Sequence, residues 1–142
     1  MMNRSLRALA VAAALWLVPA FVQAQDKPVV ASDGWIKLPA EGDTGAQAYA
    51  NINNPGMYDA YIVSGTSEVA EKVELRDAKK GNASADDVTL VHYETTSLNP
   101  AGQYLFLSGL KRPLKEGEKI WISLKLDTNE TVDVEATVKK AP

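Results

Sequence analysis

The chain contains no cysteine, one histidine (His92) and three methionines in 142 residues. Without a thiol it forms no disulfide and offers no thiolate to a metal, so a packed core must supply its stability. A lipoprotein anchor attached through cysteine is likewise not expected. The 15 Lys and Arg residues are outnumbered by 18 Asp and Glu residues. Because phosphate binding depends on clustered basic residues, we do not expect nucleic acid as a partner.

The first 24 residues have the pattern of a secretion signal. Two arginines lie in the first seven positions, an apolar stretch runs from Leu6 to Phe21, and Val22-Gln23-Ala24 supplies the small residues of a cleavage site. The apolar stretch is shorter than the roughly 20 residues that span a bilayer. We therefore expect residues 1–24 to be a signal peptide and residues 25–142 to be one domain. A periplasmic or secreted location follows, with no stable membrane anchor after cleavage.

The remaining sequence alternates between apolar and polar residues in short segments. Ile120 to Leu126 and Thr131 to Val138 each place four apolar side chains on one face, and the turn residues 127–130 between them predict a hairpin. Asp33-Gly34 is expected to interrupt the predicted strand from Val29 to Lys37. Six further segments have strand character: Val29 to Lys37, Gln47 to Asn53, Tyr58 to Ser64, Val69 to Asp77, Val88 to Glu94 and Tyr104 to Ser108.

About eight short strands with turn signals every 8–12 residues or so are typical of an all-β sandwich or barrel. One region fits two interpretations. Between Ser67 and Lys80 the apolar residues could lie on a strand or on one face of a helix. No composition change or linker indicates a second domain.

Few residues could carry catalytic or metal chemistry. On the predicted strand Val88 to Glu94, alternation puts His92 and Glu94 on one face, where the pair could bind a metal, carry a proton or simply face solvent. Met57, in a predicted turn, could be a soft metal ligand or a packing residue. No nucleophile elbow or phosphate-binding glycine loop is present, so we identify no catalytic residue and do not expect an enzyme.

Four segments follow one another along the chain: Asp33-Gly34-Trp35-Ile36, residues 48–56 (AYANINNPG), residues 69–75 (VAEKVEL) and residues 109–117 (GLKRPLKEG). In this order they resemble the PCu(A)C (PCuAC) family of periplasmic copper chaperones. The resemblance spans nearly all of residues 31–138 and implies a cupredoxin-like Greek-key β-sandwich. It also implies delivery of Cu(I) to the binuclear copper centre of cytochrome oxidase, alone or with a thiol-bearing partner. A periplasmic protein or an oxidase assembly factor is therefore the expected partner.

The copper ligands of that family are two histidines and two methionines. The resemblance puts Arg76 at the first histidine position and Tyr104 and Phe106 at the His-x-Met pair, with Asp87 or Val91 at the remaining methionine. Cu(I) prefers thiolate, thioether and imidazole donors, and none of these residues has one. A cation–π or stacking surface is one interpretation of Arg76, Tyr104 and Phe106 at these positions. The other is that the three side chains only fill and cover the former metal site.

Two functions therefore stay open. The first is a non-catalytic binding or interaction module of the copper-chaperone family that lacks the usual Cu(I) site. The second is a copper metallochaperone for oxidase assembly with a weaker site around His92 and Met57, with Glu94 as a further candidate ligand. Copper is the only cofactor that the resemblance suggests, and the residues by themselves imply none.

Overall fold

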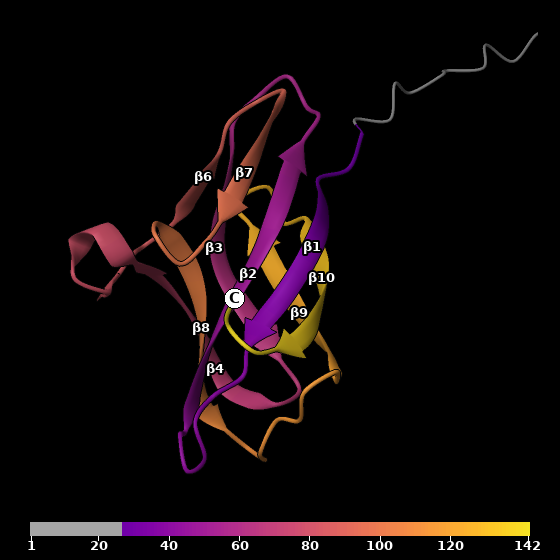
Figure 1. The fold of residues 1–142 in the computed structure, drawn as a ribbon. Coiled ribbons are helices and arrows are strands. Elements are labelled where there is room, and N and C mark those ends of the chain that lie inside the picture. Colours follow the sequence, from indigo (N-terminus) through magenta and orange to yellow (C-terminus); the bar gives the residue numbers. More distant parts are fainter. Residues whose placement is uncertain (1–26) are drawn as a thin grey trace, which may run out of the picture.

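A computed structural model describes residues 27–142, and the predicted signal peptide lies outside them. The described residues form ten strands and one short 3-10 turn (Figure 1). No helix among them is long and apolar enough to cross a membrane. The elements are β1 (Val30–Lys37), β2 (Gly45–Asn54), β3 (Ala60–Ser67), β4 (Ala70–Asp77), η1 (Ala78–Lys80), β5 (Ala83–Ser84), β6 (Val88–Leu90), β7 (Glu94–Leu98), β8 (Gln103–Leu110), β9 (Lys119–Leu126) and β10 (Thr131–Lys139).

The strands close into a barrel. They follow the order β4-β8-β2-β1-β10-β9-β3, and β3 returns to β4 through the pair of Gly65 and Val73. Strands β1 and β10 run parallel, and the other neighbours are antiparallel. Neighbours that are far apart in sequence mark the crossovers of a Greek-key arrangement. The all-β fold expected from the sequence is confirmed.

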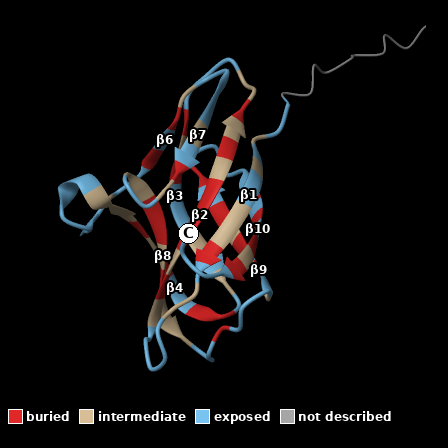
Figure 2. Cartoon of the chain, in the orientation of Figure 1, coloured by how far each residue is buried: buried red, intermediate tan, exposed pale blue. Residues whose placement is uncertain are grey.

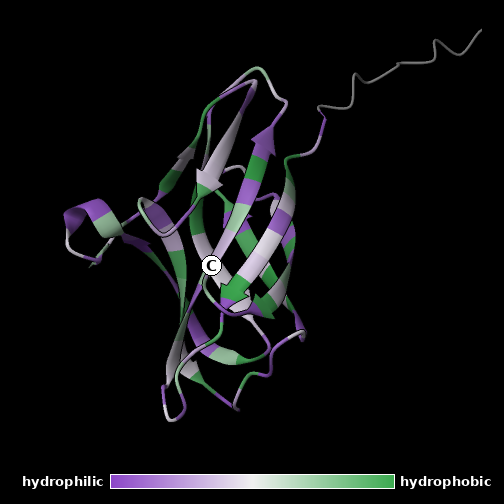
Figure 3. Cartoon of the chain, in the orientation of Figure 1, coloured by the Kyte–Doolittle hydropathy of each residue, from purple (hydrophilic) through white to green (hydrophobic). Residues whose placement is uncertain are grey.

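The core lies between the facing walls of the barrel. The predicted hairpin is present as β9 and β10, and its alternate residues from Ile120 to Leu126 and from Val132 to Val138 are buried. The same alternation appears along β2, where Ala46, Ala48, Ala50 and Ile52 are buried (Figures 2 and 3). Because side chains on one face of a strand repeat every second residue, the outward residues of these strands remain free to form a separate surface.

The sequence interpretation of residues 88–94 as one strand is wrong. Strand β6 ends at Leu90, a turn follows, and β7 begins at Glu94. Tyr93 adopts a φ of 59°, which reverses the chain between the two strands. His92 and Glu94 therefore do not share the face of one strand.

The two interpretations of residues 67–80 are resolved in favour of a strand. Strand β4 pairs with β8 from Ala70 to Asp77. The side chain of Asp77 then accepts a hydrogen bond from the backbone N–H of Lys79 at 2.9 Å, which starts the short η1 turn. The predicted break at Asp33-Gly34 is not a break of the strand, because β1 runs through it, but the register of β1 and β2 shifts there between Ser32 and Trp35, and Asp33 has a φ of 52°.

Candidate functional site on the outer face of the barrel

Four aromatic side chains lie on the outer face of three neighbouring strands. They are Trp35 from β1, Tyr49 from β2, and Tyr104 and Phe106 from β8, and we call them the outer aromatic cluster. The ring centroids of Trp35 and Tyr49 are 4.5 Å apart, and those of Tyr49 and Tyr104 are 6.1 Å apart. Both tyrosines are almost completely buried although they are not part of the barrel core. The barrel thus has a second packed layer on its outside.

Cations cover this cluster at both ends. On β4, the guanidinium carbon of Arg76 lies 3.8 Å from the centroid of the Phe106 ring. The ammonium of Lys139 on β10 lies 4.9 Å from the centroid of Trp35. Both distances are within the range of a cation–π interaction. The family resemblance grouped Arg76 with Phe106, and in the structure the two side chains are in contact.

The register of β4 and β8 explains this contact. Arg76 pairs with Tyr104, and Glu74 pairs with Phe106, so the Arg76 side chain needs only to lean along the strand to reach the ring. Glu74 accepts a hydrogen bond from Nη2 of Arg76 at 2.7 Å, and its other oxygen is 3.3 Å from the ammonium of Lys72. The guanidinium is therefore fixed by a carboxylate on one side and a ring on the other.

Glycine at position 45 makes room for the Phe106 ring. A Cβ atom on Gly45 would lie well inside 3.0 Å of the ring atoms of Phe106. The ring is thus held between the backbone of β2 and the guanidinium of Arg76. This contact is a packing reason for glycine, because Gly45 does not have a positive φ.

The two buried tyrosines have partners for their hydroxyl groups. The hydroxyl of Tyr104 donates to Oδ1 of Asn82 at 3.0 Å, and that of Tyr49 donates to the side-chain oxygen of Gln47. Burial raises the pKa of Tyr49, and the nearby Tyr104 raises it further. The Tyr49 phenol is therefore a neutral hydrogen-bond donor near pH 7 rather than an anionic ligand.

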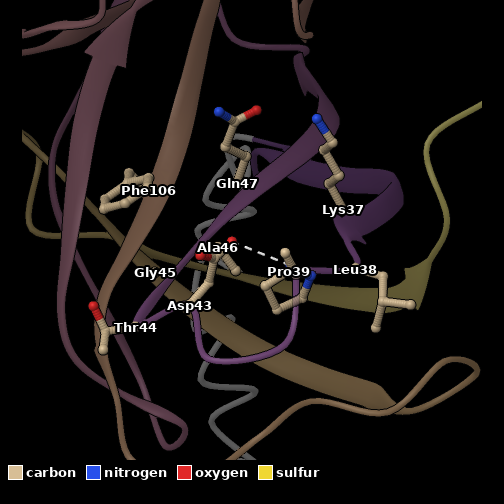
Figure 4. Close-up of a pocket in the computed structure, with 10 residues that line it drawn as sticks. Lys37, Leu38, Pro39, Asp43, Thr44, Gly45, Ala46, Gln47 and Phe106 are labelled. Carbon is tan, nitrogen blue, oxygen red and sulfur yellow. Dashed lines mark hydrogen bonds between the residues drawn. The ribbon is translucent and has the colours of Figure 1, made fainter.

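A cavity of about 560 Å³ lies beside the cluster. Figure 4 shows the Phe106 ring on one side of it and Leu38 and Pro39 of the β1–β2 loop on the other. The loop is shaped by a hydrogen bond of 3.1 Å from the backbone N–H of Ala40 to Asp43. A cavity of this size matches small-molecule sites and can also receive a side chain of a partner. Its lining residues are Lys37, Leu38, Pro39, Ala40, Asp43, Thr44, Gly45, Ala46, Gln47 and Phe106.

His92 lies elsewhere, in the turn between β6 and β7. Its Nδ1 is 2.6 Å from Oδ1 of Asp59, and its backbone N–H donates to the same oxygen at 2.9 Å. These hydrogen bonds lower the pKa of Asp59. The contact connects the β6–β7 turn to the β2–β3 loop. It uses Nδ1 of the imidazole, so Asp59 does not engage the other ring nitrogen, Nε2.

The other candidate ligands, Met57 and Glu94, have surroundings of their own. Met57 is exposed and lines a small cavity of about 110 Å³, which neither His92 nor Glu94 lines. Glu94 begins β7, pairs with Asn54 and is exposed. Among residues 27–142, no three His, Cys, Asp or Glu side chains are grouped closely enough to hold a metal ion.

The residues that the resemblance assigns to the family's copper positions do not have the donor atoms that suit Cu(I). Arg76 presents a cation, Phe106 presents a hydrocarbon ring, and the Tyr104 hydroxyl is directed to Asn82. Of the two alternatives for the remaining position, Asp87 is an exposed residue before β6, and Val91 has only a hydrocarbon side chain. A soft cation gains no thioether or imidazole donor from this set.

Sequence reasoning did not identify Trp35, Tyr49, Gln47 and Gly45 as parts of the site. The sequence did contain a signal for Trp35 and Tyr49. Both are aromatic residues on the outward faces of the first two strands, where a solvated face would carry polar residues. The strand order that brings β1 and β2 beside β8 is not local in sequence. Register alone therefore could not connect them with Arg76.

The ion pair that fixes Arg76 makes one pH-dependent contribution to stability. The hydrogen bond from Arg76, with a smaller one from Lys72, lowers the pKa of Glu74 below its ordinary 4.5. A lowered carboxyl pKa stabilises the fold above pH 4.5, and this contribution is lost as the pH falls through the folded-state value. We expect Glu74→Gln to reduce the free energy of unfolding at pH 7 by at most about 1 kcal/mol, with a smaller difference at pH 3.

Urea denaturation at pH 7 and pH 3 measures this effect. Glu41→Gln is the control, since Glu41 is exposed on the β1–β2 loop. Its difference from the original chain should be near zero at both pH values. An equal loss of stability at pH 7 and pH 3 for Glu74→Gln would contradict the assigned ion pair.

Comparison with known proteins agrees with this structure. Residues 29–138 match the sequence model of the LpqE-like family, described as "Putative lipoprotein LpqE-like". A protein of Leifsonia xyli subsp. xyli, "Putative lipoprotein Lxx21020", is 31% identical over 153 residues, covering 96% of this chain and 91% of that protein.

Solved structures of similar proteins have the fold described above. The apo PCuAC domain from PmoF1 is 26% identical with a TM-score of 0.71, covering 78% of this chain and 92% of that domain. The solution structure of CuI-DR1885 from Deinococcus radiodurans is 28% identical with a TM-score of 0.69, covering 82% of each chain. The copper-bound PCuAC domain from PmoF2, at 21% identity and a TM-score of 0.70, has the same fold. The chain therefore belongs to the LpqE-like family and has the fold of the PCuAC copper-chaperone domains.

Proposed function

We propose that the protein is an exported, non-catalytic binding module of the copper-chaperone family that engages a protein partner through the outer aromatic cluster and Arg76. In this proposal the cluster takes the place of the family's Cu(I) site. The observation that carries it is the guanidinium of Arg76 at 3.8 Å from the Phe106 ring centroid. Export is supported by the leader-like residues 1–24 and by the lipoprotein names of the family and its Leifsonia relative.

The composition of this surface favours a protein partner. Arginine and tryptophan are among the residues that dominate binding energy at protein interfaces. Arg76, Trp35 and Phe106 are only partly buried here, while the two buried tyrosines of the cluster support them from below. Here Arg76 is fixed by Glu74 and Phe106, so little side-chain entropy remains to be lost on binding. The adjacent cavity of about 560 Å³ offers space for one side chain of the partner. A periplasmic protein or an oxidase assembly factor is the partner that the family resemblance implies.

One observation favours a second function, that of a weak copper carrier. The Nδ1 atom of His92 contacts Asp59 at 2.6 Å, which is how metal-binding histidines are commonly oriented, with Nε2 left for the metal. Solved relatives are described as copper-bound or as CuI-DR1885, and these descriptions apply to those proteins. A single imidazole with one exposed thioether provides too few soft donors for a tight site.

A competition titration with Cu(I) under anaerobic conditions separates the two functions. For the binding module we expect no stoichiometric Cu(I) binding tighter than about 1 µM, equivalent to about 8 kcal/mol. His92→Ala is the deciding variant, because His92 is exposed and its loss should leave the fold intact. Tighter binding that disappears in His92→Ala would replace the proposed function by the copper carrier.

A further inference from the structure

One end of the barrel carries most of the exposed apolar surface. Six large apolar or aromatic side chains are markedly exposed among residues 27–142, and four of them lie at the end where β1 begins. Tyr58 is 81% exposed, Met57 66%, Tyr93 65% and Val30 54%. We call these four residues the apolar rim. Exposed apolar side chains that gather in one place usually mark a contact surface rather than random exposure.

Hydrogen bonds of a buried asparagine and of an exposed histidine hold the loops that carry the apolar rim. Nδ2 of Asn54, which is almost completely buried, donates to the backbone carbonyls of Tyr58 and Leu90 at 2.9 Å each. These bonds join the β2–β3 loop to the end of β6. The contact of His92 with Asp59 joins the same loop to the β6–β7 turn. Met57, Tyr58 and Tyr93 are therefore displayed by two loops that support each other, and Val30 is displayed by the start of β1, although all four side chains are exposed to solvent.

The described chain begins at this same end. Val30 pairs with Asn53 near the end of β2, and Lys27 and Val29 line the small cavity together with Met57. Figure 1 shows the start of β1 beside the arrowhead of β2 and the β6–β7 turn. The apolar stretch Leu6 to Phe21 precedes β1 by the eight residues 22–29, which reach at most about 28 Å when fully extended.

We propose that the apolar rim is a docking surface for the headgroup region of a neutral phospholipid bilayer. Before the predicted cleavage after Ala24, when the apolar leader is in a membrane, the short connection keeps this end of the barrel within reach of the bilayer surface. Tyrosine suits this position, since its ring can enter the interface while its hydroxyl stays hydrated. The contact is shallow and peripheral, and it is separate from the surface around Arg76.

The charges near the rim specify the kind of lipid. Lys27 is the only basic side chain in the lining of the rim cavity, where Asp59 and Glu130 contribute carboxylates. Binding to anionic lipid surfaces requires clusters of lysine and arginine. Docking should therefore occur on phosphatidylcholine and depend little on salt.

The absence of cysteine from the sequence allows a site-specific test. Single variants Tyr58→Cys, Tyr93→Cys and Trp121→Cys of the full chain are labelled with a nitroxide and bound to phosphatidylcholine vesicles. Trp121 is the matched control, an exposed aromatic residue near the opposite end of β9. Electron paramagnetic resonance then compares collisions of each label with oxygen, which concentrates in lipid, and with a water-soluble nickel chelate.

On vesicles, labels at positions 58 and 93 should gain collisions with oxygen and lose collisions with nickel by about two-fold or more, while the label at 121 stays in water. Equal aqueous exposure of all three labels would overturn the proposal, even if the leader holds the chain on the vesicle. Circular dichroism verifies folding of each variant. If Tyr93→Cys does not fold because of its positive φ, Met57→Cys replaces it with the same expected result.

Discussion

The variant Gly34→Ala should lose about 3 kcal/mol of its free energy of unfolding, the upper end of the usual range for an overpacked site. A Cβ atom on Gly34 would lie well inside 3.0 Å of the backbone carbonyl oxygen of Glu135, and 2.9 Å from Cγ1 of Val134. Backbone cannot move aside as a flexible side chain can. Gly34 also belongs to the parallel pairing of β1 with β10 that closes the barrel.

Gly102→Ala is the matched control for this prediction. Its Cβ atom would lie 3.6 Å from the nearest atom, an ordinary contact with Asn99, and Gly102 does not have a positive φ. Its effect should be within about 0.5 kcal/mol. Urea denaturation of both variants measures the difference. Equal stability of Gly34→Ala and Gly102→Ala would mean that β1 and β10 are not as close as the structure places them.

The second large effect is a gain of copper binding. If the outer aromatic cluster occupies the family's copper position, the combined variant Arg76→His, Tyr104→His and Phe106→Met should bind Cu(I) at least about 100-fold more tightly than the original chain, a difference of about 2.7 kcal/mol. The register of β4 and β8 places positions 76 and 104 opposite each other, with 106 on the same face. Two imidazoles and a thioether would then meet at one place, which suits Cu(I).

A second triple variant separates new donors from simple removal of the cluster. Arg76→Gln, Tyr104→Phe and Phe106→Leu removes the cation–π contact and the hydroxyl without adding a soft ligand. It should bind Cu(I) no better than the original chain in the same competition titration. A similar affinity for both triple variants would show that positions 76, 104 and 106 do not form the family's copper position in this chain.

Much of the fold follows from local pattern, and the exceptions have a physical reason. The β9–β10 hairpin was predictable because four apolar residues alternate on each side of a turn. The turn within residues 88–94 was not, because residues 91–94 keep an alternation of their own, and the two consecutive apolar residues Leu90 and Val91 were the only break in the pattern. Only the positive φ of Tyr93 reveals the reversal, and tyrosine is not a residue that signals such a conformation.

The candidate site was predictable only in part. A family resemblance identified Arg76, Tyr104 and Phe106. These residues are neighbours because of the pairing register of β4 and β8, which cannot be read from the sequence. Trp35 and Tyr49 escaped attention because outward residues of a strand are normally solvated. Their packing arises from the order β1-β2-β8-β4, which brings distant segments together on one face.

The central claim, that a cation–π contact of Arg76 and Phe106 stands in place of a Cu(I) site, is tested most directly by NMR. The Nε–H signal of Arg76 and the ring signals of Phe106 and Tyr104 are recorded before and after one equivalent of Cu(I) under anaerobic conditions. We expect an upfield shift of the Arg76 signal from the Phe106 ring current in the free protein, and no change at these three residues on adding Cu(I). Cu(I)-induced shifts centred on Arg76, Tyr104 and Phe106 would contradict the claim.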